Sequence, residues 1–240
     1  PPMASELPMD RLELTYRCHK RIAEMLRRWM YERYDEIEYR SKEEEVLNSP
    51  VSEIYAVREI LDPEHPLILV LHDEDTSQQA NPTEVEVAKS IVEGVPEDED
   101  WGIVTPHNAQ RGLLKNELGD EADIDTVERY QGGERDLIIV SGTASDRESI
   151  RKKHDFILNP NRLNVAMSRM KKKLVVVASK SLFEVIPTDA EDYEDALLWR
   201  GLYHEVDADQ SEPLWSGNLS DFTDLDEDVD DAYIEVYSGS

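Results

Sequence analysis

Leu67-Ile68-Leu69-Val70-Leu71 is an unbroken apolar run, bounded by Pro66 and by the acidic residues that begin at Asp73. Such a run is typical of a strand that is buried on both faces of a parallel sheet. The chain then reaches Asn81-Pro82-Thr83-Glu84, which predicts a helix start with an amide N-cap, proline at the first position and glutamate at the third. A buried strand followed by a helix is the repeating unit of an α/β fold.

The same alternation continues along the chain in both directions. Connections of a few residues separate apolar stretches from segments whose apolar residues recur at helical spacing. We expect strands at residues 12–15, 67–71, 101–105, 123–127, 137–142 and 174–179, and helices after residue 19 and at residues 52–61, 81–95, 108–118, 162–171 and 189–203. The sequence therefore predicts an α/β protein whose parallel sheet is covered by helices on both faces.

The composition is dominated by a net charge of −28, with 54 acidic residues against 26 basic ones. So acidic a composition usually argues against a nucleic-acid-binding protein, because phosphates are bound through cationic contacts. The alternative explanation is a surface adapted to very high salt, where long-range repulsion is screened. We favour a halophilic protein over an acidic protein from a low-salt cell.

Hydrophobic residues make up 39% of the chain and charged residues 33%, which indicates a soluble globular protein. No apolar run approaches the ~20 residues that a membrane-spanning helix needs, so we expect no membrane partner. Cys18 is the single cysteine, which excludes an internal disulfide and fits a reducing cytoplasm. The chain begins with Pro1-Pro2 and lacks an initiator methionine, so we expect it to be a piece of a longer protein.

Two stretches depart from the average charge. Residues 205–240 carry 12 acids and no lysine or arginine, and we expect them to be a partly ordered acidic tail with one late strand, attached to a domain of residues 1–204. Residues 147–180 carry ten bases and two acids. We interpret this second stretch as a cationic surface kept for an anionic partner, and a merely solvated cationic patch is the alternative.

The cationic stretch contains a segment with two separate faces, from Asn161 to Arg169. As a helix, it places Arg162 and Arg169 on one stripe, about 10 Å apart along the axis. The apolar residues Leu163, Ala166, Met167 and Met170 lie on another stripe. Guanidinium groups are rigid bidentate donors that suit phosphoryl oxygens. A solvated polar face with no ligand is the competing interpretation.

Polar segments follow several of the predicted strands, and in doubly wound sheets the chemistry lies at the carboxyl ends of the strands. Tyr16-Arg17 follows the first extended stretch, and Arg162 and Arg169 come after the strand at 137–142. The other two segments are Thr105-Pro106-His107-Asn108-Ala109-Gln110 and Thr126 with Tyr130-Gln131-Gly132-Gly133-Glu134. They offer hydroxyls, amides, glycines and arginines, with no nucleophile paired to a base. This chemistry predicts a surface that contacts phosphate and sugar.

Together these segments resemble four motor motifs of superfamily 1 helicases, in the branch of the nonsense-decay and Dna2-type enzymes. Tyr16-Arg17-Cys18-His19 is similar to a Tyr-Arg-Met-His motif, and Thr105 to Gln110 resembles the fourth motif, with His107 where tyrosine is commoner. Residues 125–136 resemble the fifth motif, with Tyr130 in place of phenylalanine. Residues 162–169 resemble the sixth. The motifs occur in the family's order and span residues 16–179.

The resemblance implies a RecA-like fold and the role of second motor domain, with ATP and Mg²⁺ bound mainly by a first RecA-like domain of the same polypeptide. Tyr16 would stack near the adenine, while Arg17 and Arg169 would act as arginine fingers on the γ-phosphate. The other residues implied on the nucleotide side are Gln131, Gly132, Glu134 and Arg162. Pro1-Pro2 resembles the end of the third motif, which would place the start of the chain just past the first domain.

The second partner that the resemblance implies is single-stranded nucleic acid, with DNA favoured over RNA. The residues that would contact the strand are Thr105, His107, Asn108, Gln110 and Thr126. No phosphate-binding Gly-x-x-x-x-Gly-Lys-Ser/Thr loop occurs in the chain, so the chain alone is expected to hydrolyse no ATP. The alternatives are a RecA-like scaffold without catalysis and a Rossmann-type enzyme, although the latter's Gly-x-Gly-x-x-Gly turn is missing.

Three further residue patterns have structural interpretations. Cys18 replaces the motif's methionine, and we expect it to be buried packing. The strand at 67–71 runs into Asp73-Glu74-Asp75 and mimics a Walker B motif, but we expect a core strand with a solvated acidic end. The histidines lack metal-ligand spacing with Cys18, so no metal site is predicted.

Overall fold

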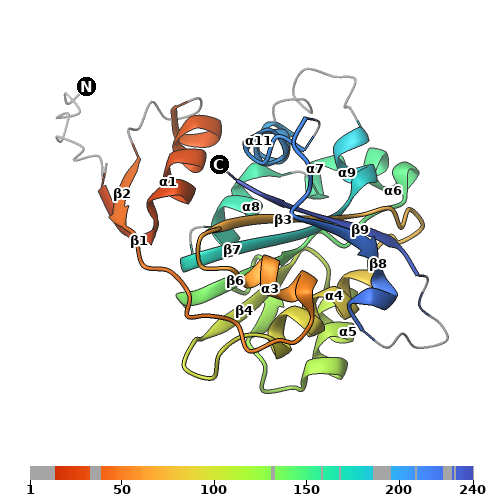
Figure 1. The fold of residues 1–240 in the computed structure, drawn as a ribbon. Coiled ribbons are helices and arrows are strands. Elements are labelled where there is room, and N and C mark those ends of the chain that lie inside the picture. The colour runs from red at the N-terminus through yellow and green to blue at the C-terminus, as the bar shows by residue number, and fades with distance from the viewer. Residues whose placement is uncertain are drawn as a thin grey trace, which may run out of the picture.

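A computed structural model describes residues 14–32, 39–130, 133–157, 159–167, 169–185, 196–208, 210–223, 229 and 231–239. Its central feature is a sheet of seven strands in the order β5-β4-β6-β7-β3-β9-β8 (Figure 1). The first five strands of this order are parallel: β5 (Ile124–Thr126), β4 (Trp101–Thr105), β6 (Arg135–Ser141), β7 (Met170–Ser179) and β3 (Leu67–His72). The predicted α/β class with a parallel sheet is confirmed.

Helices cover both faces of this sheet (Figure 1). One face carries α3 (Tyr55–Leu61), α4 (Pro82–Glu93) and α5 (Asn108–Leu118). The opposite face carries α1 (Lys20–Leu26), which continues as a π-helix over Arg27–Tyr31, and also α8 (Pro160–Met167) and α11 (Leu197–Glu205). The short helices are α6 (Arg147–Lys152), α7 (His154–Ile157), α9 (Lys180–Glu184) and the 3-10 helix Leu219–Asp221.

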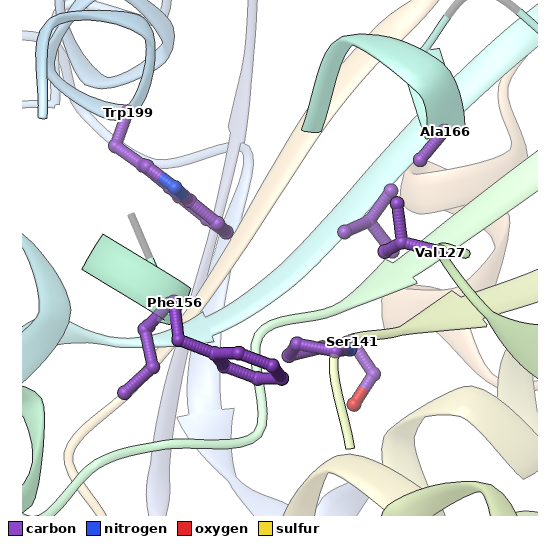
Figure 2. Close-up of a pocket in the computed structure, with 8 residues that line it drawn as sticks. Val127, Ser141, Phe156, Ala166 and Trp199 are labelled. Carbon is purple, nitrogen blue, oxygen red and sulfur yellow. The ribbon is translucent and has the colours of Figure 1, made fainter. Parts of the chain in front are cut away.

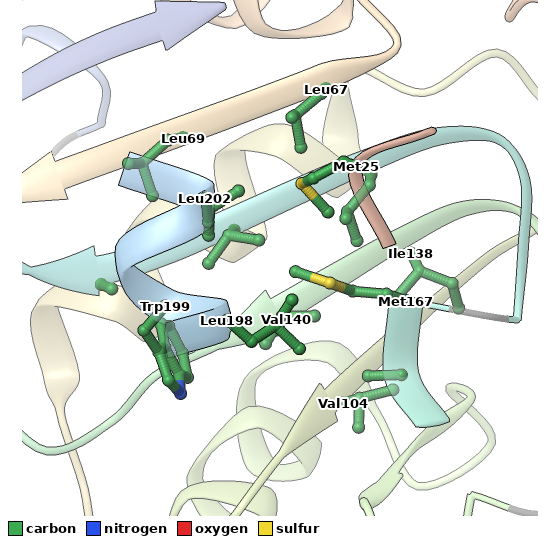
Figure 3. Packing of buried hydrophobic residues seen from close by; sticks show 14 of the residues in the cluster. Met25, Leu67, Leu69, Val104, Ile138, Val140, Met167, Leu198, Trp199 and Leu202 are labelled. Atoms are coloured by element: carbon green, nitrogen blue, oxygen red, sulfur yellow. The ribbon is translucent and has the colours of Figure 1, made fainter. Parts of the chain in front are cut away.

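Strand β3 shows why a continuous apolar run is needed at the centre of the sheet. Leu67, Leu69 and Leu71 pack into the core beneath α1, α8 and α11, whereas Ile68 and Val70 pack into the core beneath α3 and α4. Figure 3 shows Leu67 and Leu69 beside residues of the first of these cores. Burial of each such side chain contributes about 1.5–3 kcal/mol. The predicted burial of this strand on both faces is confirmed.

Helix α4 begins where the sequence predicts. The Asn81 side chain accepts a hydrogen bond from the Glu84 backbone N–H at 3.2 Å, and Pro82 occupies the first helical position. The Glu84 carboxylate does not reach back to the N-cap, as a capping box would require. It points instead into the protein, where its side chain is fully buried.

The boundary between α8 and β7 differs from the predicted one. We expect a helix to Lys171, but α8 ends at Met167 and β7 begins at Met170, which pairs with Arg135 in the ladder. Met170 is buried in either arrangement, so its place on the apolar stripe does not distinguish helix from strand. The last predicted helix is observed from Leu197, and its expected beginning at 189–195 lies outside the described residues.

A small second sheet precedes the main one. Strands β1 (Leu14–His19) and β2 (Arg40–Glu43) pair in parallel, and β1 lies against β7. The sequence predicts an extended stretch near β1 but contains no clear signal for β2, because that strand is polar along its length. None of the helices in the described ranges is long and apolar enough to cross a membrane.

Two strands of the main sheet come from the acidic segment 205–240, for which we expect a tail with one strand. Strand β9 (Tyr233–Ser238) pairs antiparallel with β3, and β8 (Trp215–Asn218) pairs with β9. In β9, Ile234 and Val236 are fully buried, which accounts for the alternating apolar pattern there. This part of the segment therefore belongs to the same sheet and covers the edge of β3.

Candidate nucleotide and nucleic-acid interface

The polar segments lie at opposite ends of the parallel strands, which we call the carboxyl edge and the amino edge of the sheet. Thr105 and Thr126 are paired residues at the carboxyl ends of β4 and β5. Arg169 lies at the other edge, before the start of β7, and its carbonyl oxygen accepts a hydrogen bond of 3.0 Å from the Arg135 N–H at the start of β6. The expectation that all these segments share the carboxyl edge is therefore wrong for Arg169 and for Glu134, which precedes β6. The helix α8 runs against the strand direction, so its last residues arrive at the amino edge.

The segment 127–134 connects these two edges. Residues 127–130 follow β5 at the carboxyl edge, and Gly133 and Glu134 precede the start of β6 at the amino edge. Val127 and Tyr130 are buried in the core of the face that carries α8. Gln131 and Gly132 lie outside the described residues, and Gly133 and Glu134 are partly buried. One short piece of chain thus passes from the predicted strand contacts to the neighbourhood of Arg169.

The Asp123 carboxylate binds Tyr130 of this segment and Arg135, the first residue of β6. The Tyr130 hydroxyl donates to the Asp123 carboxylate at 2.8 Å, and the Arg135 Nε lies 2.8 Å from the same Asp123 oxygen. Burial, together with the hydrogen bond to Asp123, raises the pKa of Tyr130 above its usual range. A Cβ atom on Gly102 would collide with the Tyr130 hydroxyl, so the missing side chain at this residue of β4 makes room for the hydroxyl. The Tyr130 hydroxyl, which the phenylalanine of the motif lacks, therefore binds the Asp123 carboxylate.

Arg169 differs from the other cations of the stretch 147–180. Its side chain is half-buried, and its Nε is buried without a hydrogen-bond partner. No ion pair to Arg169 is found within the described part of the chain. A buried guanidinium nitrogen that lacks an acceptor is suited to an anionic ligand such as a phosphate.

Most of the remaining positive charge is paired inside the chain. Lys172 lies 2.6 Å from Glu99, Lys180 2.6 Å from Glu235, and Lys152 2.6 Å from Glu148. The other engaged cations are Arg147 with Glu184, Lys171 with Asp136, and Lys173, which donates to backbone carbonyls. Six of the ten bases thus neutralise or contact groups of the protein itself. More than half of the positive charge in this stretch is therefore engaged within the chain.

The remaining residues predicted on the nucleotide side are placed only in part. Tyr16 and Arg17 lie in β1, beside β7, and Arg162 lies in α8, but the side chains of all three lie outside the described part. Cys18, the next residue of β1, is fully buried, which confirms its predicted packing role. Burial raises the pKa of the Cys18 thiol to about 11, so the thiol is unreactive at neutral pH.

The residues predicted to contact the strand differ in exposure. Asn108 is exposed as the first residue of α5. His107 is mostly buried, with its ring centroid 5.2 Å from that of Phe156. Thr105 and Thr126 are buried at the strand ends. Gln110 is fully buried, and its amide accepts from the Asn81 N–H at 2.7 Å and donates to the Ser141 hydroxyl at 3.0 Å. Asn108 is thus the exposed member of this set.

The acids after β3 are not simply solvated, as predicted for Asp73-Glu74-Asp75. Glu74 is half-buried and accepts hydrogen bonds from Ser145 at 2.6 Å and from the side chain of Asn81 at 2.8 Å. Thr76 and Ser77 donate to it as well. Burial alone would raise the pKa of Glu74, but the hydrogen bonds from Ser145 and Thr76 outweigh it and hold the pKa below its usual range. Glu74 therefore fastens the loop after β3 to the loop after β6.

An apolar pocket lies at the carboxyl half of the sheet, beneath α7, α8 and α11 (Figure 2). Its lining residues are Pro106, Val127, Val140, Ser141, Phe156, Ile157, Ala166 and Trp199. Pro106 and Val127 come from the fourth and fifth motifs. The pocket therefore lies directly behind the edge at which Thr105 and Thr126 end their strands.

A family profile described as an AAA domain matches residues 3–181 of the 240. The chain belongs to the AAA domain family. The matched residues extend past the end of β7 and include all four motifs, whereas α11, β8 and β9 lie beyond them.

Two of the following relatives of this AAA domain are named as helicases, and the third is named as a regulator of nonsense transcripts. DNA replication ATP-dependent helicase/nuclease JHS1 of Arabidopsis thaliana is 33% identical over 156 residues, which are 59% of the chain and 12% of that protein. DNA polymerase alpha-associated DNA helicase A of Saccharomyces cerevisiae is 36% identical over 109 residues, 41% of the chain and 15% of that protein. Regulator of nonsense transcripts 1 homolog of Drosophila melanogaster is 35% identical over 91 residues, 34% of the chain and 8% of that protein. The chain thus matches only a small part of each relative, and these names agree with the helicase resemblance of the motifs.

The AAA domain brings Ser141, His72 and Glu84 together, but not as a hydrolytic triad. The Ser141 hydroxyl donates to Glu84 at 2.5 Å, and His72 Nε2 lies 3.2 Å from the other Glu84 oxygen. The carboxylate thus stands between serine and histidine, and all three side chains are fully buried. A fully buried serine is out of reach of a substrate, and the histidine does not contact it. Within the described residues, no group of three or more histidine, cysteine or acidic side chains is arranged to hold a metal.

Proposed function

We propose that this AAA domain is the second motor domain of an ATP-dependent superfamily 1 helicase. In this proposal, ATP with Mg²⁺ binds between this domain and a first RecA-like domain of the same polypeptide, which holds most of the Mg²⁺ contacts. The observation that carries the proposal is the buried Arg169 Nε, which has no hydrogen-bond partner and lies at the end of a motif typical of helicase motors. The names of the relatives support the same class of activity.

The nucleotide side of the proposed site is the amino edge of the sheet. Arg169 and Arg17 reach the γ-phosphate as arginine fingers, and Tyr16 stacks near the adenine. Gln131, Gly132 and Glu134 complete this edge, and Arg162, near the start of α8, is also assigned to the nucleotide. ATP supplies the phosphoanhydride bond whose hydrolysis drives movement. The domain's own part is to place positive charge where negative charge develops.

The nucleic-acid side is the carboxyl edge, with single-stranded DNA as the favoured partner. Asn108 is exposed and contacts the strand directly in this proposal. Thr105, His107, Gln110 and Thr126 lie beneath it and shape the edge. DNA is favoured because two of the relatives are named for DNA replication or DNA polymerase association. A cytoplasmic location fits the single reduced thiol of Cys18.

A scaffold without catalysis is the second candidate, because the chain contains no phosphate-binding loop and its described residues include no nucleophile with an activating base. The two functions differ in what the full-length parent does. A motor hydrolyses ATP when a single strand is present, whereas a scaffold does not.

The decisive experiment measures strand-stimulated ATPase of the full-length parent in molar KCl, for the wild type and Arg169→Ala. We expect the variant to lose about 10³-fold or more in kcat, as for other arginine fingers. Arg147→Ala is the matched control, because Arg147 lies in the same cationic stretch but is exposed and paired with Glu184. It is expected to retain wild-type turnover.

Three results would contradict the proposal in different ways. Nearly unchanged turnover of Arg169→Ala would make Arg169 structural and refute the site assignment. No turnover by the wild type would favour the scaffold. Steady hydrolysis by the isolated chain would show that no first domain is needed.

A further inference from the structure

Glu84 is a fully buried carboxylate at the start of α4, and it receives hydrogen bonds from the end of β6. The Thr143 backbone N–H donates to both of its oxygens at 2.9 Å, and the Ser141 hydroxyl donates at 2.5 Å. His72, the last residue of β3, lies 3.2 Å away on the other side. One carboxylate thus joins α4 to the carboxyl ends of β3 and β6.

The backbone of Thr143 has a conformation that needs support. Its φ is 67°, in the left-handed region that a β-branched residue rarely adopts. The Glu84 carboxylate accepts the N–H of this residue, and Asn81 donates to its carbonyl at 3.3 Å. Both polar groups of the Thr143 backbone are therefore held by the first residues of α4, so that the turn after β6 is fixed by that helix.

Residues of this turn also form hydrogen bonds with residues of the proposed nucleic-acid-binding edge. The Thr143 hydroxyl lies 2.8 Å from the Thr105 hydroxyl at the end of β4. The Ser141 hydroxyl, which donates to Glu84, accepts from the Gln110 amide at 3.0 Å. Thr105 and Gln110 are each one hydrogen bond away from a group that Glu84 binds. Thr105 and Gln110 are therefore buried residues that lie beneath the exposed Asn108 and hold that part of the chain in place.

We propose that Glu84 is a positioning residue for the nucleic-acid edge, which fixes the turn after β6 and, through it, Thr105 and Gln110. This inference rests on the proposed function. A carboxylate is needed because it accepts from every surrounding donor, and charge-assisted hydrogen bonds hold geometry more firmly than neutral ones. The Thr143 N–H donates to both carboxylate oxygens, so a glutamine at this position would place an NH₂ group against this donor in either orientation of its amide.

The test uses the full-length parent in molar KCl and compares wild type with Glu84→Gln. We expect the Kd for a labelled oligo-dT strand to rise about 10- to 100-fold, the equivalent of one lost charge-assisted contact. Strand-free ATPase is expected to keep its wild-type kcat and KM for ATP, because the side-chain contacts of Glu84 that the structure describes are with His72, Ser141 and Thr143. A general loss of structure would lower both activities together.

Glu86→Gln is the matched control. Glu86 lies on the same helix and is also buried, but it faces Lys89 at 3.9 Å and takes no part in the contacts of Glu84. We expect this variant to bind the strand as the wild type does. If Glu84→Gln fails to fold, Thr105→Val provides the test, since it removes only the hydroxyl that meets Thr143, and a several-fold rise in Kd is expected.

The outcomes separate this inference from the proposed function. A Glu84→Gln protein that melts at a lower temperature but binds the strand with wild-type affinity would overturn the inference while strand-stimulated turnover still supported the motor. Wild-type affinity of Thr105→Val would overturn it in the same way. A wild-type parent without strand-stimulated turnover would instead refute the proposed function, and this inference with it.

Discussion

Lys173 lies inside the protein with 1% of its surface exposed, at a position where a strand normally carries an apolar residue. Its ammonium group donates to the backbone carbonyls of Asp62, at 2.8 Å, and His65. Burial lowers the pKa of Lys173 to about 7, far below the value of about 10.4 for an unfolded chain. Between these two values the unfolded chain binds a proton that the folded protein lacks, so the free energy of unfolding rises with pH in this window.

We therefore predict a pH-dependent difference between the wild type and Lys173→Met. As the pH rises from 7 to 9, the free energy of unfolding of the wild type should increase relative to that of the variant, with a slope that approaches about 1.4 kcal/mol per pH unit. Denaturant unfolding at constant KCl measures it. Lys171→Met is the control, because Lys171 is partly exposed and paired with Asp136. A constant difference between wild type and Lys173→Met across this range would contradict the prediction.

Individual residues differed in how far the sequence revealed their role. Arg169 and Asn108 belong to motifs; the Asn108 side chain is exposed and that of Arg169 is partly exposed. The role of Glu84 was hidden, because its partners on β6 are almost sixty residues away and its local pattern already has an explanation as a helix start. A side chain whose function depends on distant contacts leaves little local signal.

At the scale of elements, the segment 127–134 depends on the fit between Tyr130 and β4. A Cβ on Gly102 would collide with the Tyr130 hydroxyl. We predict that Gly102→Ala destabilises the domain by about 1–3 kcal/mol, as overpacking does, and that its effect is smaller when Tyr130→Phe has removed the hydroxyl. A double-mutant cycle of unfolding free energies should give a coupling of about 1 kcal/mol or more.

Tyr130→Phe alone restores the residue that is usual in the fifth motif, and we expect it to destabilise the domain by only about 1 kcal/mol through loss of the bond to Asp123. Gly112→Ala is the control for adding a methyl group, because a Cβ there meets no neighbour within 4 Å. Strict additivity of Gly102→Ala and Tyr130→Phe would show that the hydroxyl does not fix the segment.

Elements with strong local signals were predicted closely, and those without were not. The strand at 101–105 and the helix at 108–118 have the predicted bounds, because proline, polar caps and apolar spacing agree there. The start of β7 was misplaced because Met170 fits both an apolar helix stripe and a buried strand. The polar strand β2 has no apolar pattern, and its pairing with β1 arises from tertiary contacts.

At the scale of the whole molecule, a net charge of −28 opposes the compact state at low salt. The Debye length falls from about 10 Å at 0.1 M to about 3 Å at 1 M salt, so repulsion between surface carboxylates is largely removed at molar KCl. We predict that the melting temperature rises by at least about 5 °C between 0.1 M and 2 M KCl, the equivalent of a few kcal/mol for a chain of this size.

The shape of this salt dependence identifies its cause. Screening predicts that most of the gain occurs below about 1 M KCl. A gain that continues linearly to the highest concentration would instead indicate general exclusion of salt from the surface. A melting temperature that is constant or falls with KCl would contradict the interpretation of a surface adapted to high salt.

The overall architecture followed from the alternation of apolar runs and amphipathic helices, but the part played by the acidic segment did not. We expect a partly ordered tail with one late strand, whereas β9 joins the main sheet beside β3 and a second strand, β8, pairs with it. Average composition over 36 residues does not reveal which sheet a short strand joins, since a strand needs only a few apolar residues on its buried face.

Strand β9 also imposes an order of events on synthesis. The central strand β3 emerges from the ribosome more than 160 residues before its antiparallel neighbour. Until residue 238 has been made, one side of β3 presents unpaired N–H and C=O groups, the kind of edge on which other chains assemble. A translation product that stops before β9 would therefore be an aggregation hazard, and the nascent chain has to be protected until β9 is made.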